Sequence, residues 1–298
     1  MIQTKDGVIT LSRTSPGNNW IAPDKFSYPA ASDKIGRLVR QLNDMRLIEA
    51  KTANAERYAR LEVEDLADDA QSRLIRLEDR DGNILAETLI GKRLLRLTGS
   101  ANSGTYIRRP GEDQSWLASG GFELDPAIET WLDQLIVEIN RKEIAKVAIT
   151  LDNGETYGVS RKEAGDALDF FELLENETLK PDANLAELAT ALTSVRMASV
   201  KPDAEMTWPE KKHVARVQTF GGLNLTIELA LIEDQPWATF LTTLGDVQGD
   251  AVAVDQARQR VEVIADKTAG WAYQINQSLY QRLTKPRSSW VEEPDSTS

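Results

Sequence analysis

The pattern of apolar and polar positions predicts two similar helices far apart in the chain. In the first, apolar residues recur at i, i+3, i+4, i+7 and i+10, and the same spacing returns 150 residues later. Such spacing places apolar side chains along one stripe of an α-helix. The first stripe consists of Ile35, Leu38, Val39, Leu42 and Met45, and the second of Leu185, Leu188, Ala189, Leu192 and Val195. The constant offset indicates an internal repeat.

Strand patterns surround both helices in the same order. Alternating residues at 7–13 and 154–161 precede the helices, and a hairpin with a turn at 79–83 or at 221–222 follows each helix. Two more strands and a terminal helix complete each half. These are strands 105–109 and 115–117 with a helix over 125–139 that Asp125 and Pro126 open, and strands 237–241 and 260–264 with a helix over 272–283.

Each half is therefore predicted as an antiparallel β-sheet with two helices packed on it, which makes the chain α+β with two tandem pseudo-repeats. The first repeat is expected at 1–150, the second at 151–291, and a disordered polar tail at 292–298. A strand at 144–151 turns at 152–154 into the second half, which predicts a hairpin junction and rigidly docked halves.

The repeat also predicts a strand at the start of the sequence. A full strand should precede the turn at 5–7, and only residues 1–4 stand there. Either this strand is short, or the sequence begins just after an upstream segment.

Charge narrows the classes of partner. The chain has 298 residues, with 47 acidic against 35 basic ones and a formal net charge of -12. Nucleic-acid binders need a basic stripe, so neither nucleic acid nor an anionic membrane surface is an expected partner. Several cations do cluster in sequence, and we expect them to alternate outward from strands. They are Arg73, Arg76, Arg80, Lys92, Arg93, Arg96, Arg108 and Arg109.

Candidate chemistry is sparse. The chain has no cysteine and one histidine, His213, which is expected to be exposed or capping at the head of a strand. The turn at 79–83 resembles the start of a calcium loop but lacks the later ligands. Gly91 and Lys92 lack the other residues of a phosphate loop, and the glycine pairs 120–121 and 221–222 carry no dinucleotide fingerprint. No catalytic, cofactor-binding or metal-ligating residue is predicted.

Two functional classes stay open because they need neither histidine nor cysteine. A glycoside hydrolase needs only paired carboxylates, and 47 acids give no way to select two. A carbohydrate-binding module would use aromatic platforms, but the tryptophan positions mostly match the core pattern. These residues are Trp20, Trp116, Trp131, Trp208, Trp237, Trp271 and Trp290.

Several motifs are shared with one bacterial family. They are 7–13 with Trp20, 28–30, 51–54, 58–61, 90–93, 104–109, 116–118 and 131–133. With these motifs the chain resembles the DUF4340 family, a bacterial domain of unknown function, over most of residues 7–200. The resemblance carries no catalytic residues. It implies an N-terminal membrane helix that holds the domain outside the cytoplasmic membrane, and an association with gliding-motility-type ABC transporter components.

The resemblance therefore leads us to expect a non-enzymatic periplasmic protein without a cofactor, attached to the cytoplasmic membrane through an N-terminal anchor alone. It would be an accessory or substrate-side subunit of an ABC-type system. A membrane permease or another envelope protein would bind at a sheet edge or in the groove between the halves. The alternatives are an envelope carbohydrate- or peptidoglycan-binding module and a carboxylate-based glycoside hydrolase.

Overall fold

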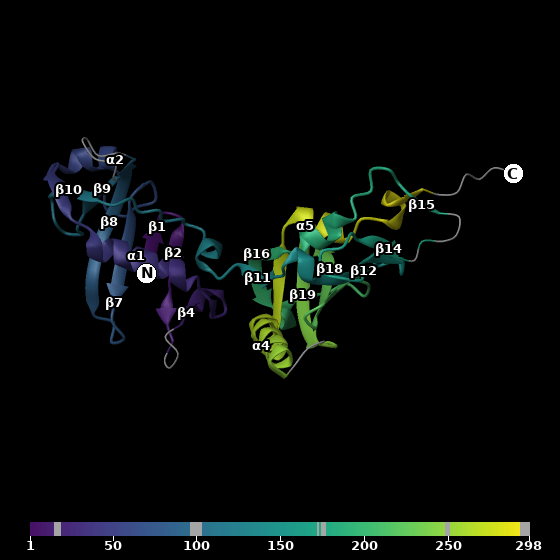
Figure 1. Ribbon diagram of the computed structural model, residues 1–298. Helices are drawn as coiled ribbons and strands as arrows, with labels where there is room; N and C mark the ends of the chain where they lie inside the picture. The colour runs from purple at the N-terminus through teal and green to yellow at the C-terminus, as the bar shows by residue number, and fades with distance from the viewer. Residues whose placement is uncertain (15–18, 96–102, 172, 174–176, 248–250, 293–298) are drawn as a thin grey trace. The chain divides into compact units, whose positions relative to one another are not determined.

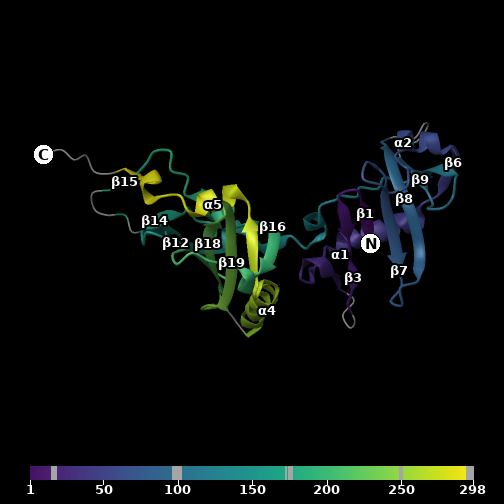
Figure 2. The same ribbon diagram turned by 180° about the vertical axis from the view of Figure 1, so that it is seen from behind.

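The computed structural model describes residues 1–14, 19–95, 103–171, 173, 177–247 and 251–292. The chain forms two compact units, Met1–Asp133 and Gln134–Ser298. Both are built from antiparallel strands and a few helices, so the α+β prediction is confirmed (Figures 1 and 2). The division falls at 133 and not at 150, because the strand predicted at the junction pairs with strands of the second unit.

The first unit contains ten strands and short helices among its described residues. In chain order the elements are β1 Ile2–Thr4, β2 Gly7–Ile9, β3 Ser12–Arg13, β4 Trp20–Ala22, η1 Pro23–Lys25, β5 Tyr28–Pro29, α1 Ser32–Asp44, β6 Leu47–Ala50, η2 Ala55–Arg57, α2 Tyr58–Leu61, β7 Arg73–Glu78, β8 Ile84–Leu94, β9 Gly104–Arg108, β10 Ser115–Ser119 and η3 Ile128–Trp131. The main sheet has the order β2-β1-β7-β8-β9-β10-β6, and β3-β4-β5 form a smaller sheet.

The main sheet of the first unit is covered on both faces by different parts of the chain. Ile35 and Leu38 of α1 are buried in a cluster with Ile90 and Ile107. Neighbouring residues on a strand point to opposite faces. Accordingly Arg108, next to Ile107, contacts the segment 51–72 on the face away from α1.

The second unit is larger. In chain order its described elements are β11 Leu135–Glu138, η4 Arg141–Glu143, β12 Ile144–Thr150, β13 Thr156–Ser160, β14 Asp169–Phe171, β15 Thr178–Leu179, α3 Ala186–Ala191, β16 Ser194–Pro202, η5 Asp203–Glu205, β17 His213–Thr219, β18 Leu223–Ile232, β19 Gln235–Leu244, α4 Ala251–Thr268, β20 Trp271–Ile275, α5 Gln277–Leu283, η6 Arg287–Ser289 and β21 Val291–Glu292. The sheet order is β11-β16-β20-β19-β18-β17-β12-β13-β14, and β15 pairs with β21.

The helices α4 and α5 cover the same face of the second sheet. Leu225 and Leu229 of β18 share one face, and they pair with Thr242 and His213 respectively. Thr242 Oγ1 donates to the Val261 carbonyl of α4 at 3.2 Å, and the ring of His213 meets that of Tyr280 in α5 edge-on. The core of this unit therefore lies between the helices and that one face.

Most predicted elements are present. The helix over 35–45 is α1, the hairpin around 79–83 is β7–β8, and the hairpin around 221–222 is β17–β18. The hairpin 144–160 is β12–β13, inside the second unit. The residues before 5–7 form the three-residue strand β1, which pairs with β2 and β7.

Three predicted elements are wrong. The helix over 125–139 is a 3₁₀ turn, η3, followed by strand β11, because this segment pairs with β16. The strand over 260–264 lies within α4, whose buried side chains include Ala257, Val261 and Ile264 at helical spacing. The helix over 272–283 divides into β20 and α5, and Asn276 caps α5 through a 2.7 Å bond to the Leu279 N–H.

Two further expectations change in detail. The alternating segment 7–13 forms two short strands, β2 and β3, in different sheets. The second repeat helix is short, ending at Ala191, because β16 begins at Ser194. The predicted tail lies almost wholly outside the described residues, which end at 292.

Candidate functional site

The hairpin β7–β8 projects beyond its neighbour β9. Pairing of β8 with β7 starts at Ile84, whereas its pairing with β9 begins only at Leu89. Among the described residues, no strand pairs with the outer side of 84–87, which we call the hairpin edge. Ile84 is 54% exposed and Leu85 is 68% exposed. The hairpin edge therefore offers unpaired backbone groups next to apolar side chains, the combination that an added strand uses.

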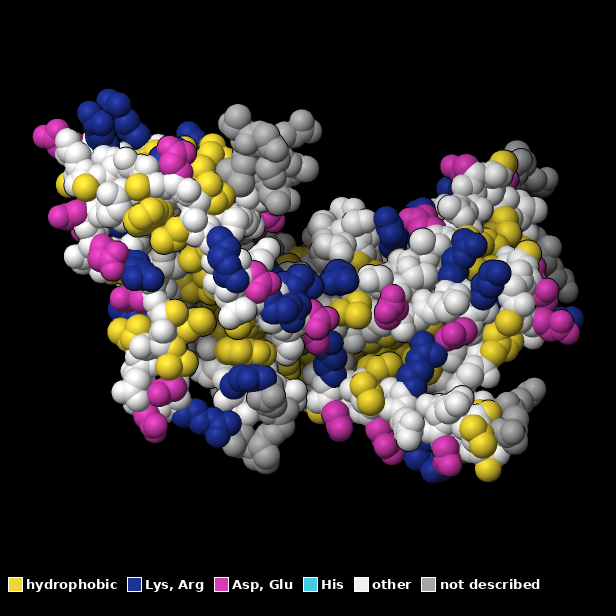
Figure 3. All heavy atoms as spheres, turned by 60° about the vertical axis from the view of Figure 1, so that its left-hand side comes forward, with side chains coloured by type: hydrophobic (Ala, Val, Ile, Leu, Met, Phe, Trp, Pro, Cys, Tyr) yellow, Lys and Arg dark blue, Asp and Glu magenta, His cyan; other side chains and the backbone are white. Residues whose placement is uncertain are grey.

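An apolar groove lies beside the hairpin edge and encloses about 480 Å³. Its lining includes the buried Ile75 and Ile107 of the sheet and Leu42 and Met45 at the end of α1. Figure 3 shows apolar side chains at the surface in the lower half of the first unit, which lies on the left in that view. Leu47 on β6, which also lines the groove, is 51% exposed. Exposed apolar surface of this kind marks contact sites for proteins or ligands.

The charged groups of this groove are already engaged. Glu87 accepts from Arg76 Nε at 2.6 Å, and Arg109 Nη1 lies 3.4 Å from Glu112 Oε1. The Glu87 carboxylate is thus already used as an acceptor by a neighbouring side chain. The groove is thus equipped for contact and lacks an evident acid–base pair.

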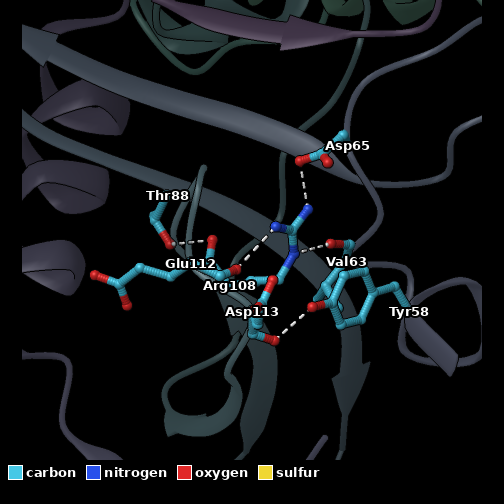
Figure 4. Close-up of polar contacts among 7 residues, drawn as sticks. All are labelled: Tyr58, Val63, Asp65, Thr88, Arg108, Glu112 and Asp113. Atoms are coloured by element: carbon cyan, nitrogen blue, oxygen red, sulfur yellow. Dashed lines mark hydrogen bonds and ion pairs between the residues drawn. The ribbon is translucent and has the colours of Figure 1, made fainter. Parts of the chain in front are cut away.

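Arg108 fixes the end of β9 next to the hairpin edge (Figure 4). Its side chain is buried, and its Nε and Nη1 donate to the carbonyls of Val63 at 2.8 Å and Glu112 at 3.0 Å. Nη2 contacts Asp65 Oδ1 at 2.5 Å, and the guanidinium lies 4.5 Å from the centre of the Tyr58 ring. Every nitrogen of this buried cation has a partner within the fold.

This arrangement assigns Arg108 a structural role. It joins the segment around 58–65 to the sheet, and Tyr58 Oη strengthens the join by donating to the Asp113 carbonyl at 2.5 Å. The chain then turns away, with the Glu112 N–H bonded to the Arg109 carbonyl. The hairpin edge exists because β9 ends at Arg108 while β8 and β7 continue.

A second groove, of about 680 Å³, is lined by Ile35, Leu38 and Val39 of α1 and shares Ile75 and Leu77 with the first. The aromatic ring in its lining, Trp20, is covered by Arg13, whose guanidinium carbon lies 5.6 Å from the ring centre. Because a cation already lies over this ring, we regard the groove beside the hairpin edge as the better contact surface.

Comparison with known proteins identifies the family. Residues 20–212 match the family model described as "Domain of unknown function (DUF4340)". The chain belongs to the DUF4340 family. The match runs from β4 to the residue before β17, so it takes in part of each unit. No curated protein and no solved structure matches the chain.

DUF4340 membership confirms the resemblance but supplies no activity. Among the described residues, no helix has the length and apolar character needed to cross a membrane. The same residues contain no group of three or more His, Asp or Glu side chains arranged to hold a metal ion.

His213 lies at the first position of β17 with its side chain 14% exposed, and of the two expected alternatives, exposed or capping, the structure favours capping. Its Nδ1 accepts the backbone N–H of Asp152 at 3.1 Å, which ties β17 to the 152–154 turn. Burial lowers the pKa of His213 below its usual value of 6.5, and the Asp152 carboxylate opposes this shift only in part. At neutral pH the ring is therefore an uncharged acceptor.

The two loop motifs have structural explanations. Asp79 closes the hairpin turn by accepting from the side-chain amide of Asn83 and from the backbone N–H groups of Asn83 and Asp81, and these bonds lower the pKa of its carboxyl. Gly91 lies under the segment 61–63. A β-carbon there would lie 2.6 Å from Val63 Cγ1. Glycine is thus required for packing at this point.

The tryptophans follow the core prediction in large part. Trp131, Trp237 and Trp290 are buried, and none of the other four is exposed. Of the clustered cations, Arg108 is the clear exception to the expected outward alternation, because the segment 51–72 covers its face of the sheet. Arg96 lies outside the described residues. No sequence pattern predicted the hairpin edge, since it depends on where two different strands end.

Proposed function

We propose that this DUF4340 protein is a non-enzymatic accessory or substrate-side subunit of an ABC-type transport system. In this proposal it works on the periplasmic side of the cytoplasmic membrane, held by an N-terminal anchor, and acts by binding a permease or another envelope protein. The location and the transport system come from the family resemblance. The mode of action is supported by the hairpin edge and the groove beside it.

The observation that carries the proposal is the incomplete pairing of β8. In the second unit, β19 pairs with β18 along its whole length, from Leu223–Leu244 to Ile232–Gln235. In the first unit the corresponding pair is β8 and β9, and β9 does not extend far enough to pair with residues 84–87 of β8. The fitting occupant is therefore an extended strand of the partner protein, whose side chains would enter the apolar groove.

Photo-crosslinking tests this proposal in membranes that contain the full-length protein. A photoreactive residue at Leu85 is expected to give an adduct with a transporter component. The matched control is Leu241, a strand residue of the second unit that is 63% exposed. Adducts with the same proteins at both positions, or no transporter component at Leu85, would contradict the proposal.

The organisation of the chain supports a further proposal, that the two units are tandem pseudo-repeats. The order β13-β12-β17-β18-β19-β20-β16 in the second sheet corresponds, strand by strand along the chain, to β2-β1-β7-β8-β9-β10-β6 in the first. In both units a helix immediately precedes the last strand of this order, α1 before β6 and α3 before β16. The helix α4 then stands where the first unit has a tight turn between β9 and β10.

A further inference from the structure

A second surface of the first unit has a different chemistry from the apolar groove. Two adjoining hollows, of about 310 and 640 Å³, lie between the polar side of α1 and the chain around Gly121. Both are lined by Arg37, Gln41, Arg93 and Gly121. Because they share these residues, we treat them as one and call it the arginine crevice.

Positive charge dominates the arginine crevice although the whole chain is acidic. Arg37 and Arg40 are exposed one helical turn apart on α1, and no ion pair joins either to an acid in the described part of the chain. The acids in the lining are Asp44 and Glu123, and Glu123 is paired with Arg93 at a position where its side chain is 81% exposed. Two guanidinium groups thus remain available.

The third guanidinium of the crevice, that of Arg93, occupies the space that a side chain at position 121 would fill. A β-carbon at Gly121 would lie 2.7 Å from Ser103 Oγ and 2.9 Å from Arg93 Cζ. The Arg93 guanidinium therefore rests directly on the Gly121 backbone. A hydroxyl and a guanidinium converge at this wall of the crevice, facing the arginines of α1.

The ammonium of Lys34 closes one end of the crevice. It donates to the carbonyl and the Oγ1 of Thr130 at 2.9 and 3.0 Å and lies 4.1 Å from the centre of the Trp131 ring. Its pKa is lowered, mainly by burial; the carboxylates of Asp125 and Glu123 oppose this shift, and Arg37 adds to it.

We propose that the arginine crevice binds a phosphate group, with Arg37, Arg40 and Arg93 as its ligands. Guanidinium groups bind phosphate oxygens through paired, charge-assisted hydrogen bonds, and an anion would neutralise Arg37 and Arg40, which have no acidic partner in the described part of the chain. The phosphate could belong to a free phosphate or phosphomonoester, or to the headgroup of an anionic lipid. The chemistry at the protein is the same in both cases.

Titration of the intact protein with inorganic phosphate at low ionic strength, followed by calorimetry, tests the site. The double variant Arg37→Gln/Arg40→Gln is expected to bind at least about tenfold more weakly, because charge-assisted bonds are lost. The matched control is Arg57→Gln/Arg60→Gln, which removes two exposed arginines at the same spacing outside the crevice. The control should bind within about twofold of the unaltered protein.

A third variant tests the geometry without changing charge. Gly121→Ala should displace the flexible end of Arg93 while leaving the fold intact, and should weaken phosphate binding. Unchanged affinity in this variant would contradict the role given to Arg93. Equal losses in the crevice variant and its control would overturn the site, because binding would then follow net charge alone.

Vesicles distinguish the two sources of phosphate. Phosphatidylcholine vesicles with and without phosphatidylglycerol are compared in a flotation assay. Binding to the anionic vesicles alone, lost in Arg37→Gln/Arg40→Gln, assigns a lipid headgroup, whereas binding of inorganic phosphate alone assigns a soluble ligand. If the unaltered protein binds neither probe, the proposal is wrong.

Discussion

Replacing Arg108 by methionine tests how the segment around 58–65 is held on the sheet. The substitution leaves the buried carbonyl of Val63 without its donor, which costs about 1–3 kcal/mol, and removes the contact with the Tyr58 ring, worth about 1 kcal/mol. The carbonyl of Glu112, on an exposed residue, can be hydrated instead. We therefore expect Arg108→Met to destabilise the first unit by about 2–4 kcal/mol.

The ion pair between Arg108 and Asp65 should contribute little to this loss of stability. The side chain of Asp65 is 77% exposed, so Asp65→Ala should cost less than about 1 kcal/mol. Arg109→Met removes a neighbouring arginine that is 70% exposed, and should stay within about 0.5 kcal/mol.

Hydrogen exchange across 58–65 is the direct assay, because a chain of two units need not unfold in one transition, and urea unfolding gives the free energy. Protection in this segment should fall in Arg108→Met and persist in the other two variants. If Asp65→Ala were as damaging as Arg108→Met, the backbone carbonyls would not be the principal partners of Arg108.

Three other outcomes are expected. His213 titrates below 6.5 when folded, so the unfolded chain takes up the proton first and the free energy of unfolding should fall as the pH drops below about 6.5. Urea unfolding at pH 7.5 and 5.5 should show a smaller loss in His213→Asn; an equal loss would contradict the assignment. Gly91→Ala should lower stability by at least about 2 kcal/mol in urea unfolding, because its β-carbon would lie 2.7 Å from the Glu62 carbonyl oxygen; a neutral effect would show that the segment yields. Residues 134–298 expressed alone should unfold cooperatively by circular dichroism, as a repeat with its own core does, and a non-cooperative melt would argue against independent repeats.

Local patterns predicted the elements that local interactions decide. The stripe 35–45 forms α1 because its apolar side chains need one face of a sheet, and 79–83 forms a turn because Asp79 bonds the backbone two and four residues on. The start signal at Asp125 is also real, since its Oδ1 accepts the Ala127 N–H at 2.9 Å. It opens only a single 3₁₀ turn, however, because Ile136 and Val137 enter β11, which pairs with β16.

Tertiary pairing decided what the patterns could not. The residues 260–264 alternate as a strand would, yet Val261 and Ile264 continue the buried stripe of α4, which becomes visible only with Ala257. Burial of Arg108 depends on a segment more than forty residues earlier in the chain. Likewise the arginine crevice combines α1, β8 and Gly121, and no spacing rule connects these positions.

The unpaired side of β8 also exposes the isolated protein to self-association. An open strand with apolar side chains is a template for edge-to-edge pairing of two identical chains, and such pairing is one route to aggregation. The turn next to it carries Asp79, Arg80 and Asp81, charged residues of the kind that protect exposed strands from self-association. These charges therefore oppose pairing between the exposed edges of two chains and help to keep the protein soluble. Shortening the hairpin to remove them would favour self-association.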